Sequence, residues 1–343
     1  MIEKVAIRVF GGDPATENYQ AIAKLSKGYQ TSIAGLNVAL LPSLKSVQNT
    51  GIAPKLLEVG GGSGRSGWAL REVLKTNGIK EINLVGTEPV LDQIKQGKQM
   101  VADKTDVELF PPLVQAWAEG PLPFPEKQFD AIFGSQMIHW LESEQAVSNH
   151  FLEAFRVLKH GGKLTHATSG IVDLGQYNVN HFTRHPFVLN TYLPFLKEEL
   201  IKEGYWKNNM GDFVPWNPSV NPAYYKFTLN KFEELLKTIG FMNIKTSQNM
   251  APLDKKEIEM RLTNLAFLNM HFFAGSFAEK ITPEKRVRLA KKAYESALKT
   301  MPDGLDNFDT QPQDIFLGQI PEGSFGEPVP VITADKPSLS TLE

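Results

Sequence analysis

The stretch from Lys55 to Thr76 constrains the fold of this 343-residue chain more than any other part of the sequence. Its first residues, Lys55–Val59 (KLLEV), are a short apolar run that predicts a buried strand. The glycine-rich turn Gly60–Gly64 follows, and Arg65–Thr76 then repeats apolar residues at helical spacing. A strand, a glycine turn and a helix in this order are typical of the βαβ units that build parallel sheets.

The alternation of strand and helix continues beyond the glycine turn. Further strands are expected at 82–86, 107–110, 129–134 and 163–167, and helices at 90–100 and 151–158. We therefore predict an α/β fold with a doubly wound, Rossmann-like sheet between about residues 51 and 170. In such sheets ligands bind beyond the carboxyl ends of the strands, so the candidate site should lie there.

More helices and two late strands are expected outside this core. Residues 14–48 are predicted to be mostly helical, with a break at Leu41–Pro42 because proline interrupts helical hydrogen bonding. Thr228–Ile239 has the pattern of an amphipathic helix that Gly240 ends. The other expected elements are helices at 188–204 and 258–272, a helix beginning at Thr282–Pro283, and strands at 242–247 and 329–333.

This pattern predicts one core with a helical cap made of two insertions. The expected segments are an N-terminal helical segment (1–50), the Rossmann-like core (51–170), a first cap insertion (171–224), a return to the core (225–250), a second helical cap insertion (251–325), and a late strand with the tail (326–343). A wholly separate second domain is the alternative. Because the cap is rich in Tyr, Phe and Trp, it favours an apolar substrate.

Composition excludes several classes of protein and site. Lys and Arg number 36 and Asp and Glu 38, so the net charge of −2 gives no basic excess for binding along nucleic acid. The absence of cysteine excludes disulfides, thiolate metal sites and a cysteine nucleophile. His181 and His185 have the spacing of a helical metal site, but Pro186 argues against a helix there, so no metal is expected.

No membrane segment and no export signal are expected. The sequence has no run of about 18 apolar residues. Its first residues, MIEKVAIRVFGGD, lack the layout of a signal peptide. We therefore expect a cytoplasmic protein that does not bind membranes.

Two ligand-binding patterns overlap in the glycine turn. Gly62, Gly64 and Gly67 satisfy the G-x-G-x-x-G pattern of dinucleotide sites. Gly60, Gly62 and Gly64 satisfy E-x-G-x-G, whose acid is Glu58. A carboxylate beside a pyrophosphate would repel it, so Glu58 favours a cationic ligand such as the amino-acid end of S-adenosylmethionine. No Gly-Lys-Ser/Thr follows, which excludes a Walker loop, and a purely structural turn stays open.

A second acid, Glu88, closes the next expected strand in the segment VGTEP. Its carboxylate can accept hydrogen bonds from both hydroxyls of an adenosine ribose, which dinucleotides and S-adenosylmethionine share. Alternatively, Glu88 only caps the helix that follows Pro89, where an acid is favourable.

Several segments, in the right order, resemble the class I S-adenosylmethionine-dependent methyltransferases. LLEVGGGSG is similar to their first motif, and VGTEP to their ribose-binding strand end. WAEGPLPFPEKQFDAIFGSQMIHWL resembles the segment through the fourth strand, and FRVLKHGGKL the turn before the fifth, with His160 where proline is usual. The resemblance covers about residues 55–168 and implies a Rossmann-like fold, S-adenosylmethionine as cofactor and S-adenosylhomocysteine as product.

The resemblance also implies roles for individual residues. It places the methionine and ribose part of the cofactor at Glu58, Gly60, Gly62 and Gly64, and the ribose hydroxyls at Glu88. It places the adenine at Pro89, Trp117, Ala118 and Glu119. The reactive sulfonium is expected near Ser135 and Gln136. The family often has Asp where Trp117 stands, so Trp117 either stacks on the adenine or fills core space.

His139 and Trp140 are the main candidates for contact with the methyl acceptor. An H-W pair after this strand is similar to trans-aconitate, juvenile-hormone-acid and plant salicylate-type carboxyl methyltransferases; in the last group the indole N–H can bind the acceptor carboxylate. A hydroxyl acceptor would need a base, for which His139 comes first and His166 second. Gln136 is expected on the substrate side, Tyr29 is expected to cover the site, and a core position for the H-W pair is the alternative.

The sequence therefore predicts an enzyme that methylates a small, largely apolar metabolite, with a carboxylate oxygen ahead of a hydroxyl. N- or C-methylation of a specialised natural product is the first alternative. A methyltransferase of macromolecules and a cofactor-binding module without activity are more distant ones. The oligomeric state stays open.

Overall fold

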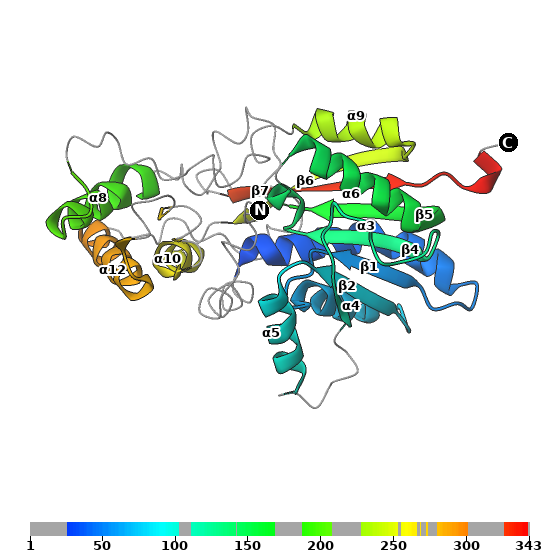
Figure 1. Ribbon diagram of the computed structural model, residues 1–343, viewed down its shortest axis with the longest axis horizontal. Helices are drawn as coiled ribbons and strands as arrows, with labels where there is room; N and C mark the ends of the chain where they lie inside the picture. Colours follow the sequence, from blue (N-terminus) through cyan, green and yellow to red (C-terminus); the bar gives the residue numbers. More distant parts are fainter. Residues whose placement is uncertain are drawn as a thin grey trace. The chain divides into compact units, whose positions relative to one another are not determined.

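The computed structural model describes residues 26–102, 111–141, 143–168, 187–207, 228–252, 255–265, 268, 272–273, 280–300 and 326–341. Within these residues, seven strands form one sheet in the order β3-β2-β1-β4-β5-β7-β6 (Figure 1). The strands are β1 (Lys55–Val59), β2 (Asn83–Glu88), β3 (Leu113–Gln115), β4 (Phe129–Ser135), β5 (Leu158–Ala167), β6 (Met242–Pro252) and β7 (Gly326–Asp335). The expected Rossmann-like α/β fold is confirmed.

The strand pairing puts β1 inside the sheet and gathers strand ends at one edge. β1 pairs in parallel with β2 and β4, β2 with β3, and β4 with β5. β7 instead runs antiparallel to β5. The carboxyl ends of five parallel strands therefore meet at one edge, which is where open α/β sheets bind ligands. The residues at these ends are Val59, Glu88, Gln115, Ser135 and Ala167.

Helices cover both faces of the sheet. In Figure 1, α6 (Glu144–Val157) and α9 (Leu229–Ile239) lie on one face, and α3 (Lys27–Gln48) and α4 (Arg65–Thr76) lie on the other. Between β2 and β3 runs α5 (Leu91–Ala102). A short 3-10 helix, η2 (Ile138–Trp140), follows β4, and another, η9 (Leu339–Thr341), follows β7.

Consecutive residues of β1 belong to two different apolar clusters, one on each face of the sheet. Leu57 of β1 packs in a cluster with Phe151 of α6 and Phe232 of α9. The preceding residue, Leu56, belongs to a cluster with Leu36 of α3. Successive side chains of a strand point to opposite faces, so a sheet covered on both faces needs apolar residues at consecutive positions. This explains why the consecutive residues Leu56 and Leu57 of β1 are both apolar.

The chain divides into two compact units. One consists of Met1–Gly28, Leu174–Asn221 and Met250–Pro328, and the other of Tyr29–Asp173, Pro222–Asn249 and Val329–Glu343. The sequence interpretation assigns residues 1–50 to one segment, whereas this division falls at Gly28, inside α3. The second unit carries the sheet edge at which the strand ends meet.

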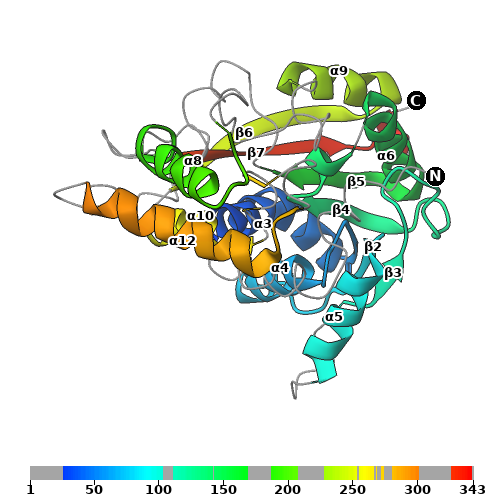
Figure 2. The same cartoon turned by 60° about the vertical axis from the view of Figure 1, so that its left-hand side comes forward.

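The first unit has an apolar core of its own. It contains η4 (Phe187–Tyr192), α8 (Leu193–Lys202), α10 (Lys255–Thr263) and α12 (Pro283–Lys299); α12 lies along α8 (Figure 2). Three of its aromatic residues, Phe187, Tyr192 and Phe273, are buried in this core. They therefore pack the unit rather than line an open pocket. No helix in the described part of the chain is both long and apolar enough to cross a membrane.

Most predicted elements that fall on described residues are confirmed, and one expectation is wrong. The expected break at Leu41–Pro42 is wrong, because α3 runs through Pro42. Proline leaves the carbonyl of Val38 without its helical donor; the Val38 side chain is 70% exposed, so water can reach this side of the helix. The strand expected at 107–110 lies outside the described residues, and β3 of the described residues is Leu113–Gln115.

Lys336, which follows β7, holds the carboxyl end of α6. Its ammonium group donates to the carbonyl oxygens of Phe155 (2.7 Å) and Leu158 (2.9 Å), although the residue is only 4% exposed. It also lies 4.6 Å from the centre of the Phe155 ring. The last carbonyls of a helix have no backbone donor within the helix, so Lys336 supplies one.

We predict that Lys336→Met lowers the free energy of unfolding by about 2 kcal/mol, because two buried carbonyls lose a charged donor. Lys80→Met, at an exposed lysine, is the control and should leave the stability unchanged. Urea unfolding followed by circular dichroism measures both variants. Equal unfolding midpoints for the two would contradict this role of Lys336.

Candidate active site

Three glycines shape the turn between β1 and α4. Gly60, Gly62 and Gly64 have φ angles of 68°, 58° and 85°, in the left-handed region that favours glycine. A Cβ atom at Gly60 would lie 2.7 Å from the Cβ atom of Met137. At Gly62 the nearest atom would be Oε1 of Gln93, at 3.7 Å. Gly60 therefore permits close packing, while at Gly62 only this one atom would lie within 4 Å of a Cβ atom.

Glu58 lies beneath this turn. Its side chain is 0% exposed, and the Ser66 hydroxyl donates a hydrogen bond to Oε1. A Cβ atom would lie 3.0 Å from Oε2 at Gly61 and 2.5 Å from it at Gly67, so the carboxyl group fills space that these glycines leave. Burial raises the pKa of Glu58 to about 8. Glu58 therefore supports the turn from inside and is mostly uncharged at neutral pH.

The expectation that Glu58 faces the cationic end of a ligand stays a prediction. In this structure the carboxyl group has no exposed surface. The reason is that the turn folds over the end of β1 toward β2. The Gly61 N–H donates to the carbonyl of Thr87 (2.8 Å), and this closes the turn over the Glu58 side chain.

Glu88 joins the turn from the end of β2. Its Oε2 accepts a hydrogen bond from the Gly62 N–H (2.9 Å), and its Oε1 accepts one from the Val90 N–H (3.0 Å). Burial raises the pKa of Glu88 to about 7, against the effect of these two hydrogen bonds. A carboxylate oxygen has two lone pairs, so Glu88 can still accept hydrogen bonds from two ligand hydroxyls. The contact with Val90 is the helix-capping alternative, and both roles are compatible.

The candidate adenine loop, Trp117–Glu119, follows β3 and lies beside the end of β2. The side-chain amide of Gln115 donates to the carbonyl of Pro89 (3.2 Å), which ties the start of this loop to the residue after Glu88. Ala118, at the centre of the loop, is buried, and its two neighbours are half-buried. The structure therefore brings these candidates to the same sheet edge as Glu88.

β4 ends in a strained turn. Its last residue, Ser135, is buried, and the next one, Gln136, has a φ angle of 54°. The Gln136 N–H donates to the carbonyl of Ala167 (2.8 Å), and its side-chain amide donates to the Ser32 hydroxyl of α3 (2.6 Å). A non-glycine residue keeps such a conformation only where its surroundings enforce it, and functional sites are a common place for it.

His139 and Trp140 lie in η2, directly after this turn. Nδ1 of His139 is 2.6 Å from the hydroxyl of Thr168, which follows β5, and His139 is 7% exposed. Trp140 is half-buried, with its ring 5.1 Å from the His139 ring at 45°. Because Thr168 engages Nδ1, proton transfer by His139 would use Nε2. Tyr29, in the first turns of α3, interacts electrostatically with Arg65 at the start of α4, near the glycine turn.

His166 does not have the position expected of a base. It is 2% exposed, and its Nε2 lies 3.0 Å from Nε2 of His150 in α6. Its ring lies against Gly134, where a Cβ atom would be 2.6 Å from Nδ1. Burial, and next the nearby His150, lower the pKa of His166 well below its ordinary value. His166 faces α6 rather than the sheet edge, so the suggestion that it accepts a substrate proton is not supported.

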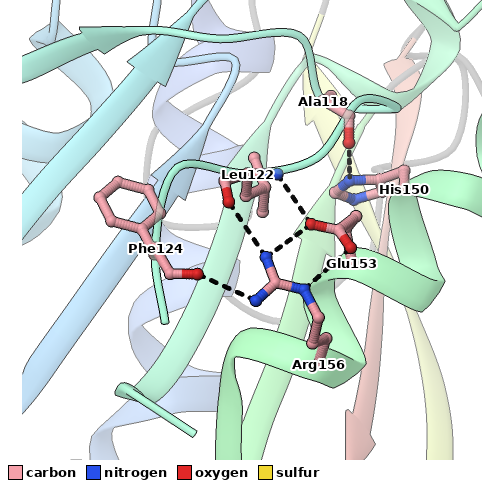
Figure 3. A network of polar contacts seen from close by, with 6 residues as sticks. All are labelled: Ala118, Leu122, Phe124, His150, Glu153 and Arg156. Atoms are coloured by element: carbon pink, nitrogen blue, oxygen red, sulfur yellow. Dashed lines mark hydrogen bonds and ion pairs between the residues drawn. The ribbon is translucent and has the colours of Figure 1, made fainter. Parts of the chain in front are cut away.

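Sequence reasoning missed a group of α6 residues that hold the loop after β3. His150, Glu153 and Arg156 are three positions apart, so they share one face of the helix, and all three contact this loop (Figure 3). This i, i+3, i+6 spacing of hydrogen-bonding residues, which ends at the first residue of the RVLKHGG segment, is the sequence signal that would have found them. No cluster of metal-binding side chains occurs among the residues that the structure describes, and His181 and His185 lie outside them.

The raised pKa of Glu58 predicts how the stability depends on pH. The folded protein binds the Glu58 proton more tightly than the unfolded chain does, so this carboxyl destabilises the fold increasingly as the pH rises from 4.5 to about 8. Glu58→Gln keeps the acceptor for Ser66 but cannot ionise. We therefore expect the free energy of unfolding of Glu58→Gln, relative to that of wild type, to be higher at about pH 8 than at about pH 5.

Urea unfolding at both pH values measures this difference. Glu72→Gln, at a partly exposed glutamate of α4, is the control and should keep the wild-type pH dependence. If Glu58→Gln and wild type show the same pH dependence, the buried position of an ionisable Glu58 is contradicted.

Comparisons with known proteins agree with this architecture. Residues 57–165 match the family model described as a methyltransferase domain. No curated protein sequence is significantly similar to the chain. The matched residues run from β1 to β5, and include the glycine turn, Glu88, the loop after β3 and the end of β4.

Several solved structures are similar at low sequence identity. The YcgJ protein from Bacillus subtilis is 14% identical, with a TM-score of 0.44 over 86% of this chain and 98% of that one. Phosphoethanolamine N-methyltransferase 2 from Haemonchus contortus is 18% identical, with a TM-score of 0.45 over 97% of this chain and 59% of that one. The [4+2]-cyclase SpnF is 16% identical, with a TM-score of 0.40 over 83% of this chain and 75% of that one.

The family match identifies the domain, since it covers the segment in which the candidate residues lie at the expected strand ends. Residues 57–165 form a methyltransferase domain, and the chain is an S-adenosylmethionine-dependent methyltransferase.

Proposed function

We propose that this enzyme methylates an oxygen of a small, largely apolar metabolite, with a carboxylate favoured over a hydroxyl. The observation that carries the proposal is the position of His139 and Trp140, directly after the strained turn that ends β4. The net charge of −2 favours a small substrate over nucleic acid. The preference for an apolar acceptor rests on the aromatic content of residues 171–225 in the sequence.

The residues present fit the cofactor. At Gly62 only one atom would lie within 4 Å of a Cβ atom, and Glu88 has lone pairs for the two ribose hydroxyls. We assign the methionine and ribose part to the turn Gly60–Gly64, and the adenine to Pro89 and the loop Trp117–Glu119. When bound, S-adenosylmethionine supplies a methyl group on a positively charged sulfur. Ser135 and Gln136 are assigned to the side of the site where this methyl group meets the acceptor.

The type of acceptor decides which side chain the reaction needs. A carboxylate is already an anion at neutral pH, so it needs alignment and exclusion of water but no base. Trp140 can orient it, because the indole N–H donates and cannot take a proton. A hydroxyl acceptor would instead lose its proton to Nε2 of His139.

A screen of acceptors tests this proposal. Purified enzyme and S-adenosylmethionine are incubated with aliphatic and aromatic acids, phenols and amines, and the products are analysed by mass spectrometry. One added methyl group on an acid, removed by mild base, would support a carboxylate acceptor. A base-stable methyl group on an amine or carbon would replace the proposal with its alternative, N- or C-methylation in natural-product biosynthesis. Transfer only to RNA or protein would overturn both.

We predict that Glu88→Gln weakens the binding of S-adenosylhomocysteine by about 1–3 kcal/mol, because a charged acceptor of hydrogen bonds is lost. Titration calorimetry measures the affinity. The control is Asp92→Asn, which removes a carboxylate from the first turn of α5. An unchanged affinity in Glu88→Gln would reject the ribose assignment.

Trp140→Phe should lower turnover of the acceptor and leave the affinity for S-adenosylhomocysteine intact, because only a donor to the acceptor is removed. Steady-state kinetics with the acceptor found in the screen gives kcat and KM. Trp68→Phe, at a half-buried tryptophan of α4, is the control for the loss of indole elsewhere. If acceptor kinetics do not change in Trp140→Phe, Trp140 is a core residue.

A further inference from the structure

The loop after β3 is held by one face of α6 (Figure 3). Arg156 donates to the carbonyl oxygens of Phe124 (2.9 Å) and Leu122 (3.0 Å), and Glu153 accepts a hydrogen bond from the Leu122 N–H (2.7 Å). Glu153 and Arg156 also form an ion pair at 2.8 Å. These contacts fix the distal part of the loop, several residues beyond the segment assigned to adenine.

His150 holds the nearer part of the same loop. Its Nδ1 lies 3.3 Å from the carbonyl oxygen of Ala118, and its Nε2 lies 3.0 Å from Nε2 of His166. The His150 side chain has no exposed surface. Glu153 and Arg156 are by comparison 20% and 30% exposed, so water can replace part of their contacts but not those of His150.

The partners of His150 determine where its proton lies. A carbonyl oxygen can only accept, so the hydrogen of the neutral imidazole must be on Nδ1. Burial lowers the pKa of His150 to about 4, which keeps the ring neutral at physiological pH. Nε2 is then an acceptor, and His166 must donate from its own Nε2. The carbonyl of Ala118 thus fixes the tautomer of His150, and His166 completes the hydrogen bonding of the ring by donating to its Nε2.

Space for this pair comes from a glycine of β4. Gly134 is the register partner of His166, and a Cβ atom there would come within 2.6 Å of the imidazole. Phe151 packs against the other side of His166, with ring centroids 5.9 Å apart. The imidazole of His166 is therefore held in one place, between α6 and the strand that leads to Ser135.

We propose that His150 is a positioning residue for the adenine of the cofactor, acting through the carbonyl of Ala118, with His166 donating a hydrogen bond to its Nε2. This inference rests on the proposed assignment of Trp117–Glu119 to adenine. Without the His150 donor the buried carbonyl would be unsatisfied, and the loop would have to turn to find another partner. The backbone of the adenine segment would then lose its fixed conformation.

Conservative substitutions at His150 test the proposal. An Asn side chain places its amide N–H near the position of Nδ1 in His, whereas a Gln side chain places it near Nε2. We expect His150→Ala and His150→Gln to weaken the binding of S-adenosylhomocysteine roughly 5- to 30-fold, and His150→Asn to restore it to within about threefold of wild type. Titration calorimetry measures the affinities, and urea unfolding records stability alongside.

Arg156→Gln is the matched control, because it loosens the same loop away from Ala118. It should lower stability but change the affinity for S-adenosylhomocysteine less than about twofold. Equal affinities of wild type and His150→Ala would overturn the proposal. So would equal weakening in His150→Asn and His150→Gln, or an affinity that only follows stability across all variants. If wild type itself does not bind S-adenosylhomocysteine, the proposed function fails and not this inference alone.

Discussion

The burial of the Glu58 carboxyl group beneath the glycine turn is the constraint on which the rest of the site depends. The Oε2 atom of Glu58 lies 3.0 Å and 2.5 Å from the positions that Cβ atoms would take at Gly61 and Gly67. Any larger residue at these glycines would displace the turn, the start of α4 or Glu58 itself. The Glu58 side chain thus supports the turn from the protein interior, and the glycines with left-handed φ angles give the turn its shape.

Two glutamates at neighbouring strand ends therefore have separate tasks. Glu58 holds the turn from inside, while Glu88 holds it from the rim through the Gly62 N–H and keeps lone pairs for a ligand. Both carboxyl groups have raised pKa values because both are buried. The two residues are of the same type, so the sequence does not show that their roles differ. The difference comes from the side of the turn on which each carboxyl group lies.

The loop after β3 shows a second principle of this site. The conformation of this loop is fixed by α6, through hydrogen bonds with His150, Glu153 and Arg156. These residues need not touch the ligand to affect its binding. Because the helix and the loop are joined by hydrogen bonds to backbone carbonyls, the loop sequence can vary while its support stays the same.

Much of the fold could be predicted from the sequence, because the signals were local. The helix Arg65–Thr76 and the helix ended by Gly240 match the structure closely, since periodicity and a left-handed glycine define them. The predicted break at Pro42 was wrong, because a helix that packs along one side tolerates a proline on its solvent-exposed side.

The side-chain directions at the site could not be predicted in the same way. The glycine turn and Glu88 were found from the motif. The burial of Glu58 and of His166 depends on how the turn closes and on Gly134, which are features of the assembled sheet. The contact of His150 also could not be predicted, because His150 and Ala118 lie 32 residues apart in the sequence and meet only when α6 packs against the loop after β3.

The most direct test of this account is a crystal structure of the enzyme with S-adenosylhomocysteine. We expect both ribose hydroxyls to donate to the carboxylate of Glu88, and the adenine to lie beside Pro89 and the loop Trp117–Glu119. The Ala118 carbonyl should still accept its hydrogen bond from His150. A ribose held elsewhere than at Glu88, or a nucleoside bound away from the glycine turn, would contradict it.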